Sequence, residues 1–467
     1  MAAKTTLKFA DNIDIVVPDS LDLITTYVLQ EQGDWFEDEI KFVRWFLQPG
    51  QKAIDIGANY GLFTLTMAQA VGPAGKVWAF EPASSTAAFL AESIASNRWG
   101  QIKLDQRALS DRPGTARLSL NNNSELNEII RSTEAVGSFE TVCLTTLDGA
   151  MDEYGWQDPD FIKIDAEGEE AAILRGGRNF FRRNSPLVQY EVKAGAQVHL
   201  ELVSAFKEMG YDSYRLVPGL AILAPFDPHG LVDGYLLNLF CCKPDRAHSL
   251  AQKGVLVLNE ELRVETGHDL LRRLNAFPAY GWEHALTRHH YGRLLKEQWH
   301  TTVERGQSET VNTALALYAV SEDDCLATSD RYMAMQLSTK MLVDVCNQHP
   351  TQSRLLTLAR VAREFGARTL AVMALETLLK NIEATQHVDV FEPFLAASKH
   401  FESVDPERSI ADWFVGSSLE ALERNASFSS FYTGSSAIQR LANIQRSGFG
   451  SPEMAKRLEL VKKRFAL

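Results

Sequence analysis

The sequence has few cysteines and no long apolar run. Its five cysteines are scattered, and neither a CxxC pair nor a Cys/His cluster indicates a zinc site or a disulfide framework. This pattern fits a reducing compartment, and we expect a cytoplasmic protein. No run of about 18 apolar residues predicts a membrane span. The first residues also lack the apolar core and cleavage signature of a signal peptide.

The chain has fewer basic than acidic residues. The 47 lysines and arginines face 60 acidic residues, which gives a net charge of −13. A negative net charge disfavours electrostatic binding of nucleic acid or anionic lipid over a broad surface, so we expect neither as a partner. With 45% hydrophobic and 23% charged residues the composition is that of an ordinary globular protein. A chain of 467 residues predicts more than one domain.

From residue 51 the pattern alternates between strands and helices. The expected strands are 52–56, 76–80, 102–108, 161–164 and 187–192, and the expected helices are 61–71, 84–97, 168–174 and 198–209. Such alternation predicts parallel βαβ units with helices on both faces of the sheet. Three further strands, at 214–217, 221–223 and 235–242, have no helix between them, which suggests an antiparallel hairpin at the end of the sheet.

The domain plan has four parts. Residues 1–49 are expected to form a helical and strand extension that packs on the core, and residues 50–246 the α/β domain. Residues 247–307 are a connection, and residues 308–467 an all-α domain, because apolar residues there recur at spacings of three and four. Within it, Phe365-Gly366-Ala367 joins two amphipathic helices into a predicted hairpin.

The turn after the first strand of this domain reads Asp55-Ile56-Gly57-Ala58-Asn59-Tyr60-Gly61. Glycine lets a ligand approach the backbone closely, and Asn59 tolerates a left-handed conformation better than most residues. A dinucleotide fingerprint needs glycine at positions 59 and 62, where this chain has Asn59 and Leu62. The turn therefore predicts a ligand site other than NAD or FAD, and a plain strand–turn–helix is the alternative.

Two further loops extend this candidate site. Glu81 closes the second strand, where an acidic group binds ribose hydroxyls in nucleoside-binding α/β folds, and Pro82 then breaks the strand. The loop after the third strand would lie beside an adenine, with Gln106 or Ala108 nearest. A surface glutamate and a generic loop are the alternatives.

Carboxylates close the fourth and fifth strands. Asp165 ends the fourth strand beside the point where α/β sheets open their ligand crevice. Asp165 and Glu167 are candidate general bases, and Glu191 is a third carboxylate at the same sheet edge. Glu169 and Glu170 are interpreted as acidic residues at a helix N-terminus. Mg²⁺ held by Asp165 and Glu191 is an alternative, but we expect no metal site.

These motifs together resemble the FkbM family of methyltransferases over about residues 25–245. The matching segments are Asp55 to Gly61, Phe80-Glu81-Pro82, Ala108 to Asp111, Thr146-Leu147-Asp148, Ile162 to Gly168 and Tyr190-Glu191. The resemblance implies a class I Rossmann-like fold with seven strands and an antiparallel last hairpin. It also implies S-adenosylmethionine as the methyl donor, and acceptors that are mostly hydroxyls of sugars or natural products. The helical region after residue 250 is not part of the resemblance.

The resemblance also implies roles for individual residues. Gly57 and Gly61 would line the methionine part of the cofactor with Asp55 facing it, Glu81 would hold the ribose, and Asp165 would lie next to the transferred methyl. The predicted cofactor-binding set is Asp55, Gly57, Ala58, Asn59, Gly61, Glu81, Pro82, Gln106, Ala108 and Asp165. The predicted catalytic set is Asp165, Glu167 and Glu191.

The predicted function is O-methylation of a hydroxyl on a saccharide or glycosylated natural product. The alternative is methylation of a peptide or protein docked by the helical domain, as helical-hairpin arrays often dock polypeptides. A non-catalytic module with the same fold is a third possibility, opposed by the intact cofactor motifs. The C-terminal helices are a candidate surface for a homodimer or a protein partner. The pair His289-His290 is interpreted as solvated or packing histidines rather than metal ligands.

Overall fold

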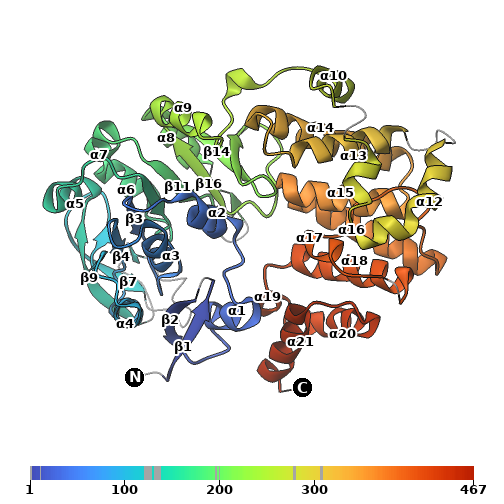
Figure 1. Cartoon of the computed structure of the whole chain (residues 1–467). Helices are drawn as coiled ribbons and strands as arrows, with labels where there is room; N and C mark the ends of the chain where they lie inside the picture. The colour runs from blue at the N-terminus through green and yellow to red at the C-terminus, as the bar shows by residue number, and fades with distance from the viewer. Residues whose placement is uncertain are drawn as a thin grey trace. The chain divides into compact units, whose positions relative to one another are not determined.

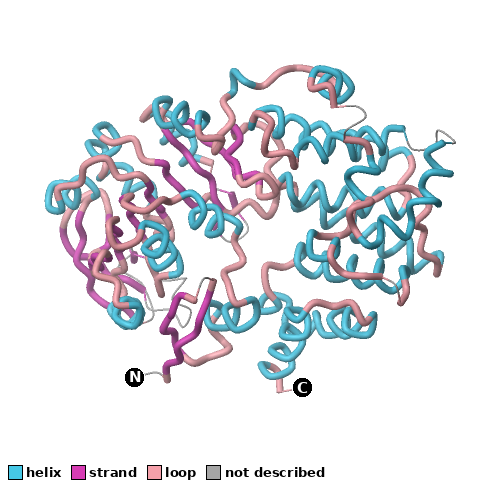
Figure 2. The backbone as a smooth tube through the Cα atoms, viewed as in Figure 1, coloured by secondary structure: helices cyan, strands magenta, loops and turns pink. Residues whose placement is uncertain are grey.

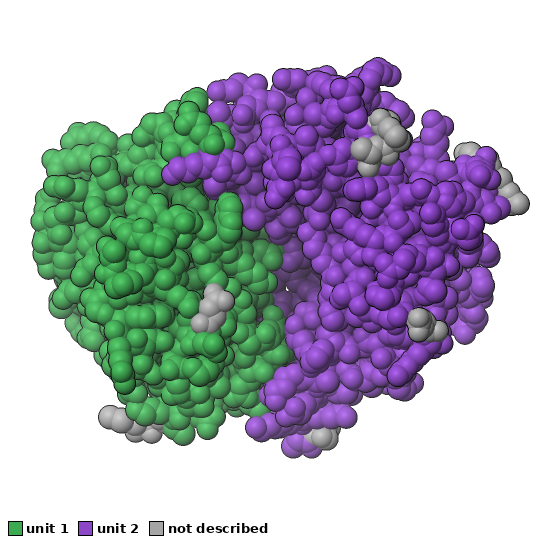
Figure 3. All heavy atoms as spheres, in the orientation of Figure 1, with its two compact units in different colours: residues 1–216, 225–232, 236–252 green, residues 217–224, 233–235, 253–467 purple. Residues whose placement is uncertain are grey.

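The computed structural model divides the chain into two compact units (Figure 3). The first comprises residues 1–216, 225–232 and 236–252, and the second comprises residues 217–224, 233–235 and 253–467. The structure describes residues 3–10, 12–119, 129–130, 138–194, 197–198, 200–276, 280–304, 309–406 and 408–466. The predicted four-part division of the chain stays a prediction.

Strands and helices of the α/β part alternate as the sequence predicts (Figures 1 and 2). The strands are β1 Lys4–Phe9, β2 Ile13–Pro18, β3 Lys52–Ile56, β4 Lys76–Phe80, β5 Ile102–Asp105, β6 Ala108–Leu109, β7 Gly114–Ser119, β8 Ile129–Ile130, β9 Phe139–Thr145, β10 Phe161–Ile164, β11 Leu187–Glu191, β12 Lys193–Ala194, β13 Gln197–Val198, β14 Asp212–Val217, β15 Ile222–Pro225 and β16 Asn238–Cys242. The helices are α1 Ile24–Gln32, α2 Asp38–Phe46, α3 Leu62–Val71, α4 Ser84–Asn97, α5 Leu147–Tyr154, α6 Glu170–Gly176, α7 Arg178–Arg183, α8 Glu201–Glu208 and α9 Pro244–Gln252.

The main sheet has the order β15-β14-β16-β11-β10-β3-β4-β5. Strands β11, β10, β3, β4 and β5 are parallel, and β16 is antiparallel to both β11 and β14. The predicted α/β class with an antiparallel end is thus confirmed. The sheet has eight strands where the resemblance implied seven, because β15 adds an outer strand beside β14.

The predicted strand 102–108 was wrong in one respect, because it is two strands. β5 ends at Asp105, whose carboxylate accepts a hydrogen bond from the backbone N–H of Arg107 (3.0 Å). This local bond turns the backbone out of the main sheet. β6 then pairs with β9 in a second sheet of order β6-β9-β7-β8.

Helices cover both faces of the main sheet. On one face, alternate strand residues such as Ile54 and Ile164 pack against α5, α6, α7 and α8. On the other face lie α2, α3 and α4, with Phe42 of α2 against Phe240 and Phe46 against Phe161. Because strand residues alternate between faces, Asp55 and Lys163 point to this second face, where they are register partners on β3 and β10. The N-terminal strands β1 and β2 pair with each other and pack near α4.

The second unit is almost wholly helical. Its helices are η2 Asn259–Glu261, α10 Gly267–Arg273, α11 Trp282–Leu286, α12 His290–Glu304, α13 Glu309–Ser321, α14 Thr328–Gln348, α15 Gln352–Phe365, α16 Arg368–Thr385, α17 Lys399–Glu402, α18 Ile410–Ala426, α19 Ser430–Thr433, η3 Gly434–Ala437, α20 Ile438–Ser447 and α21 Pro452–Arg464. Helices α15 and α16 form the predicted hairpin, with Gly366 left-handed between them (φ +90°). Helices α10 to α12 pack into the same core as α13 to α18. Among the helices that the structure describes, none is long and apolar enough to cross a bilayer.

Candidate active site

The turn from β3 into α3 is built by two backbone hydrogen bonds. The N–H groups of Gly57 and Ala58 both donate to the carbonyl of Phe80, at 3.1 and 2.9 Å. Gly57 and Gly61 have positive φ values of +79° and +96°. Asn59 has a left-handed backbone conformation, with φ +49°. Asparagine tolerates this conformation better than most residues, as expected from the sequence. The turn therefore brings the ends of β3 and β4 together.

Gly57 also meets the loop after β10. A Cβ atom at Gly57 would lie 1.6 Å from the backbone oxygen of Asp165, closer than any non-bonded contact allows. The N–H of Asp165 donates to the carbonyl of Ile56 at 3.1 Å. The chain leaves β3 toward β4 and β5 on one side and has β10 and β11 on the other, which makes this the switch point of the sheet. Glycine at position 57 is thus required by the packing of two neighbouring loops.

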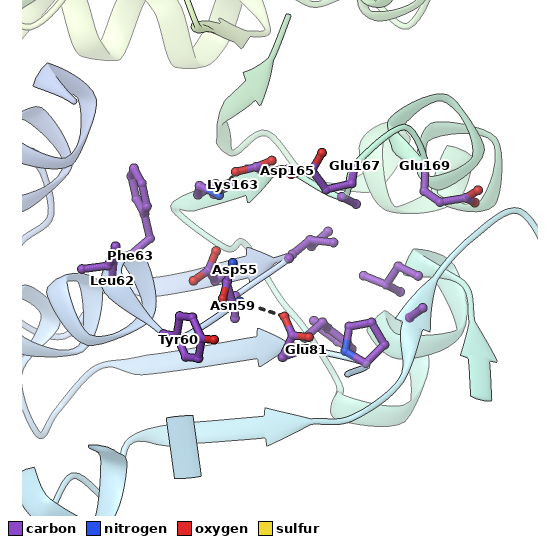
Figure 4. A pocket seen from close by; sticks show the side chains of 18 of the residues that line it. Asp55, Asn59, Tyr60, Leu62, Phe63, Glu81, Lys163, Asp165, Glu167 and Glu169 are labelled. Atoms are coloured by element: carbon purple, nitrogen blue, oxygen red, sulfur yellow. Dashed lines mark hydrogen bonds and ion pairs between the residues drawn. The ribbon is translucent and has the colours of Figure 1, made fainter. Parts of the chain in front are cut away.

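Glu81 holds the other side of the turn. One carboxylate oxygen accepts from the N–H of Asn59 at 2.8 Å, and the other accepts from the N–H of Ala83 at 2.9 Å. Figure 4 shows the first of these bonds between the ends of β3 and β4. Glu81 is 7% exposed, and burial raises its pKa to about 7 although the two N–H groups oppose this.

The raised pKa of Glu81 predicts a pH-dependent stability. The folded chain holds the proton more tightly than the unfolded chain, whose pKa lies near 4.5. Stability from this group is therefore fully present below pH 4.5 and is lost as the pH rises through about 7. At about 1.4 kcal/mol per unit, the loss is about 3 kcal/mol.

Glu81→Gln removes this titration. In chemical denaturation from pH 5 to 8, we expect the variant to lose stability less steeply than the wild type, so that the difference between them shifts in its favour as pH rises. The difference between the two proteins cancels contributions from the other carboxylates. Parallel pH profiles would show that Glu81 does not titrate in this range.

A charged group lies inside the second face of the sheet. Asp55 is fully buried, and one of its oxygens accepts from the hydroxyl of Thr64 at 2.6 Å, while the other has no hydrogen-bond partner among the residues that the structure describes. Lys163 is 4% exposed, and its Nζ lies 2.6 Å from Asp165 and 4.8 Å from the centre of the Phe63 ring. Burial lowers the pKa of Lys163, but Asp165 and Asp55 outweigh it and raise the pKa. Lys163 is therefore the charged counter-ion of both carboxylates.

Two more carboxylates surround Asp165. Burial raises the pKa of Glu37, and the charge of Asp165 adds to it. Burial, together with the negative charges of Asp165 and Glu167, raises the pKa of Glu191 to about 10. A side-chain hydrogen bond with Asp165 raises the pKa of Glu191 further. The catalytic roles predicted for Asp165, Glu167 and Glu191 stay predictions.

Glu167 is exposed and left-handed, with φ +48°, directly before Gly168 at φ +94°. A non-glycine residue in this region is strained, and such strain gathers at functional sites. Glu170 holds the loop in this conformation, because its carboxylate accepts from the N–H groups of Ala166 (2.8 Å) and Gly168 (3.3 Å). This structural role fits the interpretation of Glu170 as part of the start of a helix.

Most of these groups line one cavity of about 1040 Å³, counting its part open to solvent. This volume suits a cofactor-sized ligand. The lining residues are Thr25, Trp35, Glu37, Asp55, Ile56, Gly57, Ala58, Asn59, Tyr60, Leu62, Phe63, Phe80, Glu81, Pro82, Arg107, Ala108, Leu109, Leu118, Ile129, Lys163, Asp165, Ala166, Glu167 and Glu169. Figure 4 shows Asp55, Lys163 and Asp165 from neighbouring strands at one side of it and Glu81 at another.

The cavity brings together most of the predicted site residues. Three lie outside its lining: Gly61, which is packed against Leu90 at the start of α3, Gln106, which lies in a separate surface hollow beside Asp105, and Glu191, which reaches the site through Asp165. In place of Gln106, the neighbouring Arg107 lines the cavity, with its guanidinium held by Asp105 at 2.6 Å.

Sequence reasoning missed Trp35, Glu37 and Lys163. A signal for Lys163 was present, because a lysine inside the apolar strand Phe161-Ile162-Lys163-Ile164 must find a buried counter-ion. Trp35 and Glu37 reach the cavity only through the packing of α2 on the sheet, which no local pattern reveals.

The cavity residues fit the group that the resemblance implied. One buried carboxylate oxygen of Asp55 has no partner within the described part of the chain, and it suits a ligand that brings a cation or an N–H donor. The glycine turn leaves room for close backbone approach. Among the residues that the structure describes, the one set of three converging metal-ligand types is Asp323, Asp324 and Cys325, in the helical unit.

Comparison with known proteins gives a family match for the α/β part of the chain. Residues 55–213 match the family described as "Methyltransferase FkbM domain". A search among curated proteins found no match.

The chain is also similar to solved structures. One is the methyltransferase FkbM from Methylobacillus flagellatus KT, with 16% identity, 41% of this chain and 43% of that chain covered, and a TM-score of 0.28. Another is a putative rRNA methylase from Clostridium thermocellum, with 10% identity, 45% and 95% covered, and a TM-score of 0.29. A third is M. jannaschii TYW2 in complex with AdoMet, with 13% identity, 52% and 85% covered, and a TM-score of 0.28. Since these TM-scores are below 0.5, the assignment rests on the family match.

The family match covers the glycine turn, Glu81 and the carboxylates after β10, which line a single cavity at the switch point of a class I sheet. Residues 55–213 are therefore a methyltransferase FkbM domain, and the chain that carries it is an S-adenosylmethionine-dependent methyltransferase.

Proposed function

We propose that the protein methylates a hydroxyl group of a saccharide or glycosylated natural product. The observation that carries this proposal is the place of Asp165, a carboxylate paired with Lys163 and lying against the glycine turn. A hydroxyl acceptor must lose its proton as it attacks, and a carboxylate within reach contributes typically ~10²–10⁴-fold by taking it.

The cofactor is held by the residues of the glycine turn and by Glu81. Asp55 offers its unpartnered oxygen to the methionine end, and Glu81 offers its free lone pairs to the ribose hydroxyls. S-adenosylmethionine supplies an electrophilic methyl carbon, so the protein's part is to orient the acceptor and exclude water.

The residues around Asp165 divide the proton chemistry between them. Asp165 accepts the acceptor's proton, and Lys163, whose Nζ lies 2.6 Å away, fixes the direction of its carboxylate. Glu191 donates a hydrogen bond to Asp165, and Glu167 stands exposed at the cavity's edge. In this proposal Asp165 is the base, and Glu167 contacts the acceptor.

The test is an acceptor screen with methyl-labelled S-adenosylmethionine. Neutral mono- and oligosaccharides, glycosylated small molecules and peptides are offered separately, and the label is traced by chromatography. We expect label on saccharide hydroxyls. Label on peptides alone would replace the proposal by the polypeptide alternative. The Asp55→Asn variant, which weakens cofactor binding, is the control for enzyme-independent transfer.

Two further predictions remain proposals. The C-terminal helices are a candidate surface for a homodimer or protein partner, and the predicted cytoplasmic location agrees with the scattered cysteines.

A further inference from the structure

The N-terminal segment supplies part of the cavity wall. Trp35 is 8% exposed and lines the cavity together with Thr25 and Glu37. These residues precede the family match, which begins at residue 55. They are therefore an addition to the part of the domain that the family match covers.

The loop that carries Trp35 is braced on both sides. Arg44 holds Asp34 through two hydrogen bonds of 3.0 and 3.1 Å, and Asp34 accepts the backbone N–H of Trp35 at 2.8 Å. The indole N–H of Trp35 donates to Glu37 at 2.9 Å, and the other oxygen of Glu37 accepts from Asn238 of β16 at 3.0 Å. The aromatic ring is thus fixed before any ligand arrives, which lowers the entropy cost of binding.

Glu37 places this loop at the reacting end of the cavity. Its carboxylate interacts electrostatically with Lys163 and Asp165, and Glu191 interacts with it in turn. The acceptor side of the cavity therefore combines one aromatic side chain with carboxylates from the residue before α2, the loop that follows β10 and the end of β11.

The charges of this wall restrict what it can bind. The described lining residues include the acids Glu37, Asp55, Glu81, Asp165, Glu167 and Glu169, and the cations Arg107 and Lys163. Lys163 is already paired with Asp165, and Arg107 with Asp105. Carboxylate oxygens accept hydrogen bonds, so this wall favours a ligand that presents O–H or N–H donors. A phosphate, sulfate or carboxylate on the ligand would meet an acid-rich wall, and the two cations among the described lining residues are already paired.

We propose that Trp35 and Glu37 form the acceptor subsite, and that it selects uncharged, hydroxyl-rich pyranoside rings over their anionic counterparts. This inference rests on the proposed saccharide function and adds its binding wall and its charge rule. The apolar face of a pyranoside packs on the indole ring, and its hydroxyls donate to the carboxylates.

The test measures binding to the protein loaded with S-adenosylhomocysteine. The probes are methyl glycosides of glucose, galactose and mannose, each paired with its uronate, which differs only in a carboxylate at C6. Saturation-transfer NMR titrations give the dissociation constants. We expect at least one neutral glycoside to bind and its uronate to bind at least about tenfold more weakly, equivalent to about 1.4 kcal/mol. Equal or tighter binding of the uronates, or no binding of any neutral glycoside, would overturn the proposal.

Two variants test the separate contributions of Trp35 and Glu37 to binding. We expect Trp35→Ala to weaken the neutral glycoside at least about tenfold while S-adenosylmethionine binds normally, and Glu37→Gln to reduce the discrimination against the uronate. Trp45→Ala is the matched control, because Trp45 belongs to α2, is 52% exposed and does not line the cavity. Glycoside binding that survives Trp35→Ala would refute the subsite.

The acceptor screen tests the proposed saccharide function, and its outcome can be distinguished from that of the glycoside-binding test of the subsite. Saccharide methylation that is indifferent to Trp35→Ala leaves the function standing and removes the subsite. Methylation confined to peptides removes the function.

Discussion

Gly57→Ala is expected to abolish binding of S-adenosylmethionine and to destabilise the fold. The added Cβ would lie 1.6 Å from the backbone oxygen of Asp165, and the φ of +79° is unfavourable for any other residue. Neither atom can move alone, since the N–H of Asp165 is bonded to Ile56, at the end of β3. We expect a loss of folding stability of at least about 3 kcal/mol, the range of severe core damage.

Calorimetric titration with the cofactor and thermal unfolding measure the two effects. Gly72→Ala is the control, because Gly72 also has positive φ (+61°) but no atom lies within 4 Å of its added Cβ. The control carries the backbone strain without the clash, so it should be milder and should still bind the cofactor. Normal cofactor binding by Gly57→Ala would mean that the two loops do not touch as described.

Asp165→Asn is expected to lower kcat by about 10²–10⁴-fold with little change in cofactor affinity. The amide keeps the size of the carboxylate and a carbonyl oxygen for Lys163, but it cannot take a proton. Single-turnover kinetics with the acceptor found by the screen measure the chemical step, and calorimetry measures the cofactor. Turnover at the wild-type level would exclude Asp165 as the base.

The Glu167→Gln variant tests whether Asp165 or Glu167 is the base. Glu167 is exposed at the rim of the same cavity, so its loss should raise KM more than it lowers kcat. The reverse pattern, with kcat reduced by Glu167→Gln and preserved in Asp165→Asn, would transfer the role of base to Glu167.

The sequence predicted those parts of the site that depend on local patterns. The glycine turn, Glu81 and Asp165 follow strands whose order in a parallel sheet is strongly constrained, so their meeting at one edge could be foreseen. The left-handed backbone of Asn59 could also be predicted, because the backbone conformation of one residue is a local property.

The remainder depends on distant contacts. Trp35 and Glu37 reach the cavity because α2 packs on β16 and β10 through Phe42 and Phe46, and the sequence gives no period that records this docking. Arg107 lines the cavity where Gln106 was predicted, and this depends on the hydrogen bond that ends β5 at Asp105. The raised pKa of Glu191 depends on the burial and charges that surround it, which exist only in the folded chain.

The backbone bond between Asp165 and Ile56 has a consequence for how this enzyme changes during evolution. It joins the proposed donor-binding turn and the proposed base into one rigid unit on neighbouring strands, so a shift in either displaces both. Trp35, by contrast, is held by side-chain and loop contacts within a segment that precedes this unit. New acceptor preferences can therefore arise by substitution in residues 33–37 while the methyl-transfer geometry is preserved, and the same segment is the natural target for redesign of specificity.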